Sequence, residues 1–298
     1  MKRVCILTSL VLSILTYSGS GHCDDKGQKE LTDKPYFGEK PPGLTPKLFD
    51  PKIVSPNGRL EGGTFTPDGK TFYFSRKDAD YRKRTFYVIR HENGKWGKAT
   101  ETNIRWPQFT ADGNTMFGGK WYRERTKNGW SDIKTRGDFL KEQAHGLTIS
   151  NNGTFYFPFF KKEDNGHGNI GYSRRINGKN ELPVKMGPEI NRGEWIAHPY
   201  VAPDESYLMW DVVRDDGYGN SDIYISFRDK TGNWLPAINM GNKINSDMND
   251  SSPRVTHDGK YLFFSRGDWY RQDDGTRKWK GKSYWVDAKI IETLRPKS

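Results

Sequence analysis

One short phrase recurs five times along this chain of 298 residues. In each copy an extended segment runs into a tight turn, and an aromatic or apolar segment follows at once. The clearest turns contain Asp-Gly or Asn-Gly, and the five turns are marked by Gly69, Gly113, Gly153, Glu205 and Gly259. Successive turns are separated by 44, 40, 52 and 54 residues. Self-similarity at this period indicates a repeat fold.

Each repeat has the length of one four-stranded blade of a β-propeller. Hydrophobic residues make up only 33% of the chain, yet aromatic residues make up 14%. Aromatic rings of this number can fill the wedges between blades. We therefore predict an all-β protein with a single β-propeller of five blades. Six blades are the alternative, if the irregular stretch 174–196 hides a degenerate blade.

The two ends of the repeat region complement each other. The last repeat has no fourth strand before the chain ends, whereas residues 47–54 lead into the first repeat much as residues 234–244 lead into the last. We expect the N-terminal segment to complete the final blade, which closes the ring and removes an exposed sheet edge. The propeller is thus predicted to span residues 47–298.

The N-terminal 46 residues have a different character. Lys2 and Arg3 precede a short apolar run and a small-residue exit, the layout of a secretory signal peptide over residues 1–23. Residues 24–46 are polar and rich in Pro and Gly, so they are predicted to form a tether and lead-in. No later stretch is long and apolar enough to span a bilayer. We expect an exported protein, either periplasmic or attached to the outer membrane.

Cysteine is nearly absent from the expected mature chain. Cys5 belongs to the predicted signal peptide, which leaves Cys23 without a partner for an internal disulfide. Cys23 lies where an exported lipoprotein carries its lipid, although residues 20–22 depart from the usual pattern before such a cysteine. A lipid anchor at Cys23 and an unpaired thiol in the tail are the two alternatives.

The repeat phrase also resembles a known family. Pro67-Asp68-Gly69-Lys70 followed by the aromatic segment 71–74 is similar to the turn that marks WD40-like and TolB-like propeller repeats. The resemblance covers roughly residues 47–291 and implies the fold. Members of that family include noncatalytic periplasmic binding proteins and the propeller domains of peptidases. Related propellers occur among polysaccharide lyases of the oligogalacturonate and ulvan kind, a more distant resemblance.

The charge of the chain indicates the kind of partner. The formal net charge is +11, which favours an acidic partner, and the expected export makes nucleic acid a poor candidate. In a propeller, the loops before the inner strands share one face with the loops between the second and third strands. The latter loops are basic and aromatic in this chain, and they include Trp121, Arg123 and His167. We expect this face to bind an acidic oligosaccharide or polysaccharide.

Alignment on the five turns places the inner-strand residues in ranks around the channel. The first rank holds Glu61, Arg105, His145, Ala197 and Ser251; the second holds Gly62, Trp106, Gly146, His198 and Ser252; a further rank holds Thr64, Gln108, Thr148, Tyr200 and Arg254. Two histidines, a tyrosine and two arginines would thus converge at one mouth. The predicted substrate-binding residues are Arg254, Arg105, Trp106, Gln108, Glu61, Trp121, Arg123 and His167.

These residue types suit β-elimination on a uronic acid sugar. Arg254 or Arg105 would neutralise the carboxylate, His145 or His198 would remove the C5 proton, and Tyr200 would protonate the group leaving C4. A sugar as leaving group would make the enzyme a lyase, and a hydroxyl would make it a dehydratase. The alternative is a noncatalytic binding or scaffold protein of the cell envelope, in which the histidines only hydrogen-bond neighbouring blades.

The sequence predicts no cofactor with a recognised motif. A divalent cation remains an alternative, because His145, His198 and His167 come from loops of one face. The Asp-rich segments 215–220 and 273–275 lack the carboxylate spacing of a calcium loop and are interpreted as turns.

Overall fold

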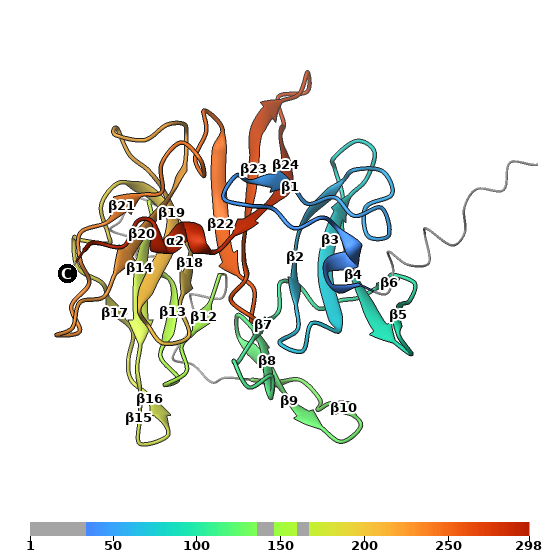
Figure 1. The fold of residues 1–298 in the computed structure, drawn as a ribbon, viewed down its shortest axis with the longest axis horizontal. Coiled ribbons are helices and arrows are strands. Elements are labelled where there is room, and N and C mark those ends of the chain that lie inside the picture. The colour runs from blue at the N-terminus through green and yellow to red at the C-terminus, as the bar shows by residue number, and fades with distance from the viewer. Residues whose placement is uncertain (1–33, 136–145, 160–166, 298) are drawn as a thin grey trace, which may run out of the picture.

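The computed structural model describes residues 34–135, 146–159 and 167–297 of the chain. This part of the chain contains five antiparallel sheets of four or five strands that follow one another around a central channel, and a separate two-stranded hairpin (Figure 1). The predicted five-bladed β-propeller is confirmed. The inner strand of each blade lines the channel and the fourth strand lies at the rim.

Within each blade the strands follow chain order from the channel to the rim, except that the N-terminal strand completes blade 5. Blade 1 consists of β2 (Leu60–Phe65), β3 (Thr71–Lys77), β4 (Arg84–Glu92) and β6 (Thr100–Glu101), with β5 (Lys95–Trp96) extending β4 as a hairpin. Blade 2 consists of β7 (Gln108–Phe109), β8 (Thr115–Gly118), β9 (Trp121–Thr126) and β11 (Lys134–Thr135), with β10 (Gly129–Trp130) extending β9. Blade 3 consists of β12 (Thr148–Ile149), β13 (Phe155–Phe159), β14 (Asn169–Ser173) and β17 (Val184–Lys185). Blade 4 consists of β18 (Glu194–Val201), β19 (Tyr207–Val213), β20 (Asp222–Phe227) and β21 (Ile238–Asn239). Blade 5 consists of β22 (Asn249–Val255), β23 (Tyr261–Arg271), β24 (Arg277–Asp287) and β1 (Lys47–Leu48).

The turn between the first and second strands explains the repeated phrase. Gly69 has a φ of +67°, a left-handed conformation that glycine adopts without steric cost. The carboxylate of Asp68 accepts hydrogen bonds from the Thr66 hydroxyl at 2.6 Å and from the Lys70 amide at 3.0 Å. The turns at Asp112 and Asp258 repeat both bonds. Side-chain caps of this kind fix tight turns, so the Thr-x-Asp-Gly phrase marks the same bend in three blades.

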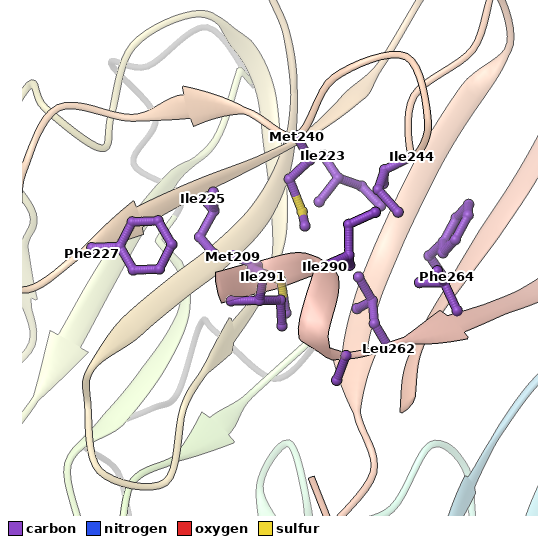
Figure 2. Close-up of a cluster of buried hydrophobic side chains, with 12 residues drawn as sticks. Met209, Ile223, Ile225, Phe227, Met240, Ile244, Leu262, Phe264, Ile290 and Ile291 are labelled. Carbon is purple, nitrogen blue, oxygen red and sulfur yellow. The ribbon is translucent and has the colours of Figure 1, made fainter. Parts of the chain in front are cut away.

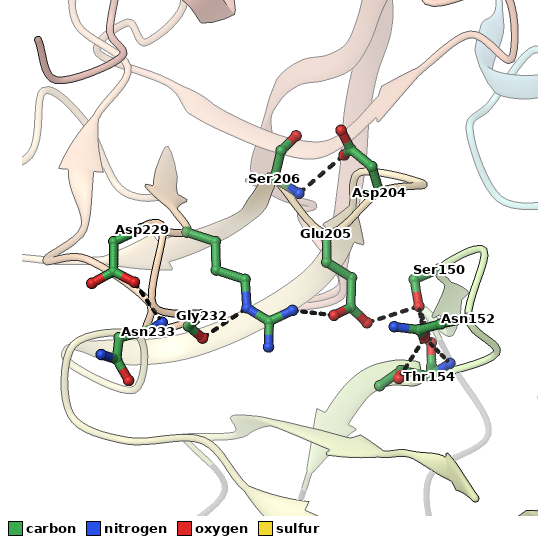
Figure 3. A network of polar contacts seen from close by, with 10 residues as sticks. Ser150, Asn152, Thr154, Asp204, Glu205, Ser206, Asp229, Gly232 and Asn233 are labelled. Atoms are coloured by element: carbon green, nitrogen blue, oxygen red, sulfur yellow. Dashed lines mark hydrogen bonds and ion pairs between the residues drawn. The ribbon is translucent and has the colours of Figure 1, made fainter. Parts of the chain in front are cut away.

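Glu205 occupies the glycine position of the fourth turn and has the same left-handed backbone, with a φ of +60°. Its carboxylate is buried and accepts a hydrogen bond from the Ser150 hydroxyl at 2.8 Å, and it is also paired with Arg228 (Figure 3). Ser150 belongs to the turn of blade 3, and Arg228 lies at the end of β20. The carboxylate therefore ties blade 3 to blade 4, which offsets the strain of a side chain at a glycine position.

The ring closes through the N-terminal strand, as predicted. In β1, Lys47 pairs with Trp285 and Leu48 with Tyr284 of β24. The next residue, Phe49, is 1% exposed and its ring contacts Trp285 at a centroid distance of 5.1 Å. The stretch 174–196 forms a short hairpin of β15 (Arg175–Ile176) and β16 (Lys179–Asn180), then β17 and the loop before β18. It contains no sixth blade in the part of the chain that the structure describes.

The last described residues before β1 pack against the propeller. Residues Pro35–Gly38 form the short 3-10 helix η1. Phe37 is buried, with its ring 4.4 Å from that of Trp96, and the Tyr36 hydroxyl donates a hydrogen bond to Asp258 at 3.0 Å. Tyr36 and Phe37 both have positive φ values. Part of the predicted lead-in is thus fixed against blades 1 and 5.

The core is divided into aromatic and aliphatic clusters between neighbouring blades. The largest lies between blades 4 and 5, and the C-terminal helix α2 (Lys289–Glu292) fills it (Figure 2). Ile290 and Ile291 of α2 are buried among side chains of both blades, including Ile225 and Leu262. Burial of this kind stabilises by roughly 25 cal/mol per Å² of apolar surface, so the small helix helps to hold blades 4 and 5 together.

Candidate functional site

One central cavity is lined by a residue from every inner strand. Thr64, Gln108, Thr148, Tyr200 and Arg254 all border it, and these are the five residues that alignment on the turns placed in one rank. The space open to the centres of water molecules is about 70 Å³. Because one water needs about 10–15 Å³ on this measure, the channel admits only a few small molecules. The lining continues toward the Asp-Gly turns, where Ala111, Pro203 and His257 border the same cavity.

The inner strands bend just above this rank. In the second rank, Trp106, Gly146, His198 and Ser252 all have positive φ values, of 45°, 70°, 47° and 57°. The pairing of β18 with β19 shifts between Ala197 and Tyr200, and that of β22 with β23 shifts between Ser251 and Arg254. These are β-bulges, which redirect side chains and concentrate next to functional sites. Three non-glycine residues in this conformation store backbone strain around the mouth.

His198 is held by a buried carboxylate of the neighbouring strand. Its Nδ1 lies 2.9 and 3.1 Å from the two carboxylate oxygens of Asp211 in β19. The backbone N–H of Ser252, at the bulge of β22, donates to the same carboxylate at 2.9 Å. Asp211 thus joins blade 4 to blade 5. The bond to Nδ1 leaves Nε2 as the nitrogen that can meet a ligand, and 46% of the His198 side chain is exposed.

The charge of His198 reflects a balance of opposing effects. The protein atoms around the half-exposed imidazole reduce its hydration, and this effect and the nearby Arg254 both oppose protonation. The Asp211 carboxylate outweighs them and raises the pKa of His198 above its usual value. A carboxylate on Nδ1 also fixes the tautomer in which Nε2 is the basic atom once the ring is neutral. His198 can therefore serve as a cation below its pKa and as a base above it.

Arg254 is a cation without a counter-ion. Among the described residues no carboxylate forms an ion pair with its guanidinium, and burial lowers the pKa of Arg254 to about 10. The neighbouring Tyr200 is itself affected by burial, which raises the pKa of its hydroxyl so that the phenol stays protonated at neutral pH. The site thus offers a forked donor and a neutral O–H donor side by side. Two parallel N–H bonds from arginine match the geometry of a carboxylate.

The predicted site residues of blades 1 and 2 contact one another and their neighbours through an ion pair and cation–π contacts. Glu61 is buried and accepts hydrogen bonds from Arg84 at 2.5 and 3.1 Å, so its charge is matched within the protein. The guanidinium of Arg84 lies 5.6 Å from the ring centroid of Trp106, and that of Arg105 lies 5.6 Å from the ring of Phe86. Arg105 and Trp106 are exposed, whereas the buried Glu61 holds Arg84, whose guanidinium faces the Trp106 ring.

Three further predicted residues have contacts outside this group. Trp121 begins β9 and packs against the core between blades 1 and 2, and Arg123 donates from Nε to the Ser131 carbonyl at 2.5 Å. His167 lies 3.7 Å from the Glu194 carboxylate, and its ring is 5.6 Å from that of Trp195. His145 lies outside the described residues.

Exposed aromatic side chains gather on the loops of this face. The most exposed aromatic residues of the described chain are Trp106, Trp195, Tyr218, Trp269 and Tyr270. Each lies near the start of an inner strand or toward the loop between the second and third strands. Trp195 is 60% exposed. Trp269 and Tyr270 lie on the long hairpin of β23 and β24, which projects at the top of Figure 1. Exposed rings of this kind can stack on sugar faces.

Two sequence-based expectations concern metals and membranes. Within the described ranges, no group of three or more His, Cys, Asp or Glu side chains is arranged to hold a metal ion. The same ranges contain no helix that is long and apolar enough to cross a bilayer. The divalent cation and the anchor at Cys23 stay predictions, since His145 and Cys23 lie outside those ranges.

Comparisons with known proteins give structural neighbours only. No family model matches the chain, and no curated protein matches its sequence. An α-L-arabinofuranosidase from Lactobacillus brevis is similar in structure with a TM-score of 0.41 and 12% identity, over 76% of this chain and 90% of that one. A GH62 hydrolase in complex with xylotriose gives 0.42 and 9%, over 76% and 91%. Prolyl oligopeptidase B from Galerina marginata gives 0.42 and 16%, over 79% of this chain and 33% of that one. Similarities this remote assign no function, which must come from the residues of the site.

Proposed function

We propose that this protein binds an acidic oligosaccharide that contains uronic acid, with the sugar carboxylate placed on Arg254 in the channel wall. The unpaired guanidinium of Arg254 is the observation that carries the proposal. Arg254 is half-buried, and a cation that is partly withdrawn from water without a partner is costly; such groups occur where a ligand supplies the counter-ion. The net charge of +11 and the exposed aromatic rings on the same face suit a sugar that is both anionic and flat.

We further propose that the bound uronate undergoes β-elimination. Arg254 neutralises the carboxylate, which makes the C5 proton acidic and stabilises the enolate-like charge that follows. Nε2 of neutral His198 takes the C5 proton, and the electron pair of the C–H bond forms the C4–C5 double bond. The C4–O bond breaks as the Tyr200 hydroxyl donates its proton to the leaving oxygen. Asp211 holds the imidazolium that results.

The noncatalytic alternative has its own supporting observation. Because Asp211 raises the pKa of His198, the imidazolium persists to higher pH than that of a free histidine. A charged His198 beside Arg254 is a second cation for a carboxylate and not a base. A binding protein of the TolB-like kind would use the pair in this way, to hold acidic glycan without changing it.

One experiment separates the two functions. The protein is incubated with saturated oligosaccharides of galacturonate, mannuronate and glucuronate. The ultraviolet absorbance of the C4–C5 unsaturated uronate is followed over time. Binding is measured in parallel by calorimetry. His198→Asn abolishes the chromophore but retains most of the binding if elimination occurs. Arg254→Gln weakens binding in either case, whereas Arg175→Ala, on the opposite face, changes neither quantity.

The outcomes are distinct. Binding without a chromophore, at every pH and with each uronate, removes the catalytic step and leaves the binding protein. Absence of binding to all of these sugars, or unchanged binding by Arg254→Gln, rejects the proposal itself.

We also propose that the protein works outside the cytoplasm, in agreement with the export predicted from residues 1–23. Mass spectrometry of the protein purified from the envelope tests this directly. A mature N-terminus near residue 24 supports removal of the signal peptide, and a lipid mass on Cys23 supports the anchor. An intact Met1 in the envelope fraction contradicts both.

A further inference from the structure

A second cavity lies on the face that carries the loops between the second and third strands. It lies in blade 1, between the loop that precedes β2 and the ends of β3 and β4, and the space open to water centres is about 210 Å³, compared with about 70 Å³ in the channel. Its lining includes Arg59, Arg76, Lys77, Asp78 and Tyr87. The pocket is thus separate from the residues that the proposed reaction uses.

The cations of this pocket have unused donors. The side chain of Arg59 is half-buried and has no hydrogen bond or ion pair within the described part of the chain. Arg76 donates from Nε to the Val54 carbonyl at 2.5 Å and stacks on the ring of Tyr87 at 4.5 Å, so none of its contacts is with a carboxylate. Both guanidinium groups retain N–H donors that the protein does not satisfy.

The one acid of the lining does not neutralise them. The carboxylate of Asp78 accepts the backbone N–H groups of Arg82 at 2.7 Å and Lys83 at 3.1 Å, which fixes it within its own loop. Lys77 lies 3.8 Å from the Glu61 carboxylate, a loose contact, because Glu61 is already bonded twice by Arg84. The pocket therefore has a net positive charge with forked donors, the arrangement that recognises planar or tetrahedral anions.

Strand β2 connects the pocket with the channel. Lys77 lines the pocket and contacts Glu61, and Glu61 precedes Thr64 of the channel by three residues on β2. Three residues of strand span about 10 Å. The pocket thus lies, along β2, within a span of the channel-lining Thr64 that a short oligosaccharide can bridge.

We propose that the blade 1 pocket is a second subsite for an anionic group, carboxylate or sulfate, of the same glycan chain that occupies the channel mouth. This inference rests on the proposed function, since it assigns the second anion to the same ligand. It also narrows the ligand: a chain with charges on successive residues is favoured over a single uronate, because the second contact forms intramolecularly and at high effective concentration.

Calorimetry with chondroitin provides the test, because the same backbone exists with and without sulfate. The ligands are glucuronate, unsulfated hexasaccharide and sulfated hexasaccharide, each titrated into the full-length protein. We expect the wild type to bind a hexasaccharide about a hundredfold more tightly than glucuronate. In Arg59→Ala that gain falls by about tenfold or more, the usual cost of losing a charged double contact. Arg175→Ala, an arginine on the opposite face, retains the gain in full.

The sulfated and unsulfated chains identify the anion. A loss in Arg59→Ala confined to the sulfated chain assigns the pocket to sulfate, and a loss with both chains assigns it to carboxylate. An undiminished gain in Arg59→Ala, with unfolding temperature unchanged, overturns the subsite. Normal binding by Arg254→Gln with weakened binding by Arg59→Ala supports the pocket and rejects the proposal that Arg254 binds the carboxylate. Weakened binding by Arg254→Gln with normal binding by Arg59→Ala supports the role of Arg254 and rejects the pocket. Arg59→Lys, which keeps the charge, recovers part of the gain if the pocket binds an anion.

Discussion

Replacement of Arg254 by methionine should make the protein more stable and abolish its binding of uronate. Burial lowers the pKa of Arg254 to about 10, which means that the folded protein disfavours the charge it contains. The described residues offer no carboxylate to compensate it. Methionine keeps the length and much of the apolar stem while removing the charge. We expect a gain of about 1 kcal/mol in the free energy of unfolding, within the range seen when a strained functional group is replaced.

The same substitution at a paired arginine should have the opposite sign. Arg84 donates two hydrogen bonds to Glu61, whose side chain is 3% exposed. Arg84→Met leaves that carboxylate buried with only the loose contact to Lys77, so it should destabilise by about 2 kcal/mol. In a domain of this size, 1 kcal/mol corresponds to about 2–4 °C in the unfolding temperature. The two variants should therefore move the transition in opposite directions by several degrees.

Scanning calorimetry measures both transitions, and titration with glucuronate measures binding. A lower unfolding temperature for Arg254→Met would mean that a structural partner of the guanidinium exists after all. Unchanged affinity for uronate in that variant would refute the assignment of Arg254 as the carboxylate-binding residue. A stabilised variant that no longer binds supports both halves of the reasoning, since the residue would then cost stability and be retained for the ligand.

Three further predictions concern the His198–Asp211 pair, the closure of the propeller by β1, and the β23–β24 hairpin. Because the pKa of His198 is raised in the folded protein, the contact with Asp211 stabilises the fold fully below the pKa of the unfolded chain. This stabilisation is lost as pH rises through the pKa of the folded protein. A pH series of unfolding temperatures should show this loss, and any elimination rate should rise over the same pH range. Phe49→Ala should cost about 3–5 kcal/mol and Leu48→Ala, 39% exposed, less than about 1 kcal/mol; equal costs in denaturant titrations would contradict closure by the N-terminal strand. Trp269→Ala should weaken oligosaccharide binding by about 1 kcal/mol, roughly fivefold, with stability unchanged within about 0.5 kcal/mol, as calorimetry will show.

The fold was predictable because its strongest constraints are local. A Thr-x-Asp-Gly turn specifies its own hydrogen bonds, so three copies in the sequence already locate three blades. The period between turns then gives the blade, and the missing last strand gives the closure through Lys47 and Leu48. The packing of Phe37 against Trp96 was not predictable in this way. It depends on a left-handed backbone at two aromatic residues, which no local sequence preference indicates.

The positions of the site residues on the inner strands could be predicted from the sequence, but their charge interactions could not. Equal spacing from the turn sufficed to bring Gln108, Tyr200 and Arg254 to one cavity, because residues at the same distance from the turn lie at the same height on their inner strands. Asp211 was not predicted as a site residue, since it lies on a second strand, inside a run of apolar residues. A lone acid within Leu208–Val213 was nevertheless a signal, because carboxylates are rarely buried in strands without a partner.

The partner of Asp211 also explains why the inner strands carry their bulges. A regular strand alternates its side chains, so His198 and Tyr200 would share one face of β18, at the same spacing as in the sequence. The bulge, with His198 at a φ of +47°, places an extra residue opposite β19 and lets the imidazole reach Asp211 while Tyr200 still lines the cavity. The matching bulge of β22 aims the Ser252 amide at the same carboxylate and leaves Arg254 in the channel wall. Two strained backbones thus converge on one acid, and such strain persists where the surrounding structure enforces it for a function. Ser252→Gly relieves the strain at one bulge without removing the amide, so it should stabilise the fold while leaving the His198–Asp211 contact in place; loss of stability would show that the left-handed backbone is not the strained element.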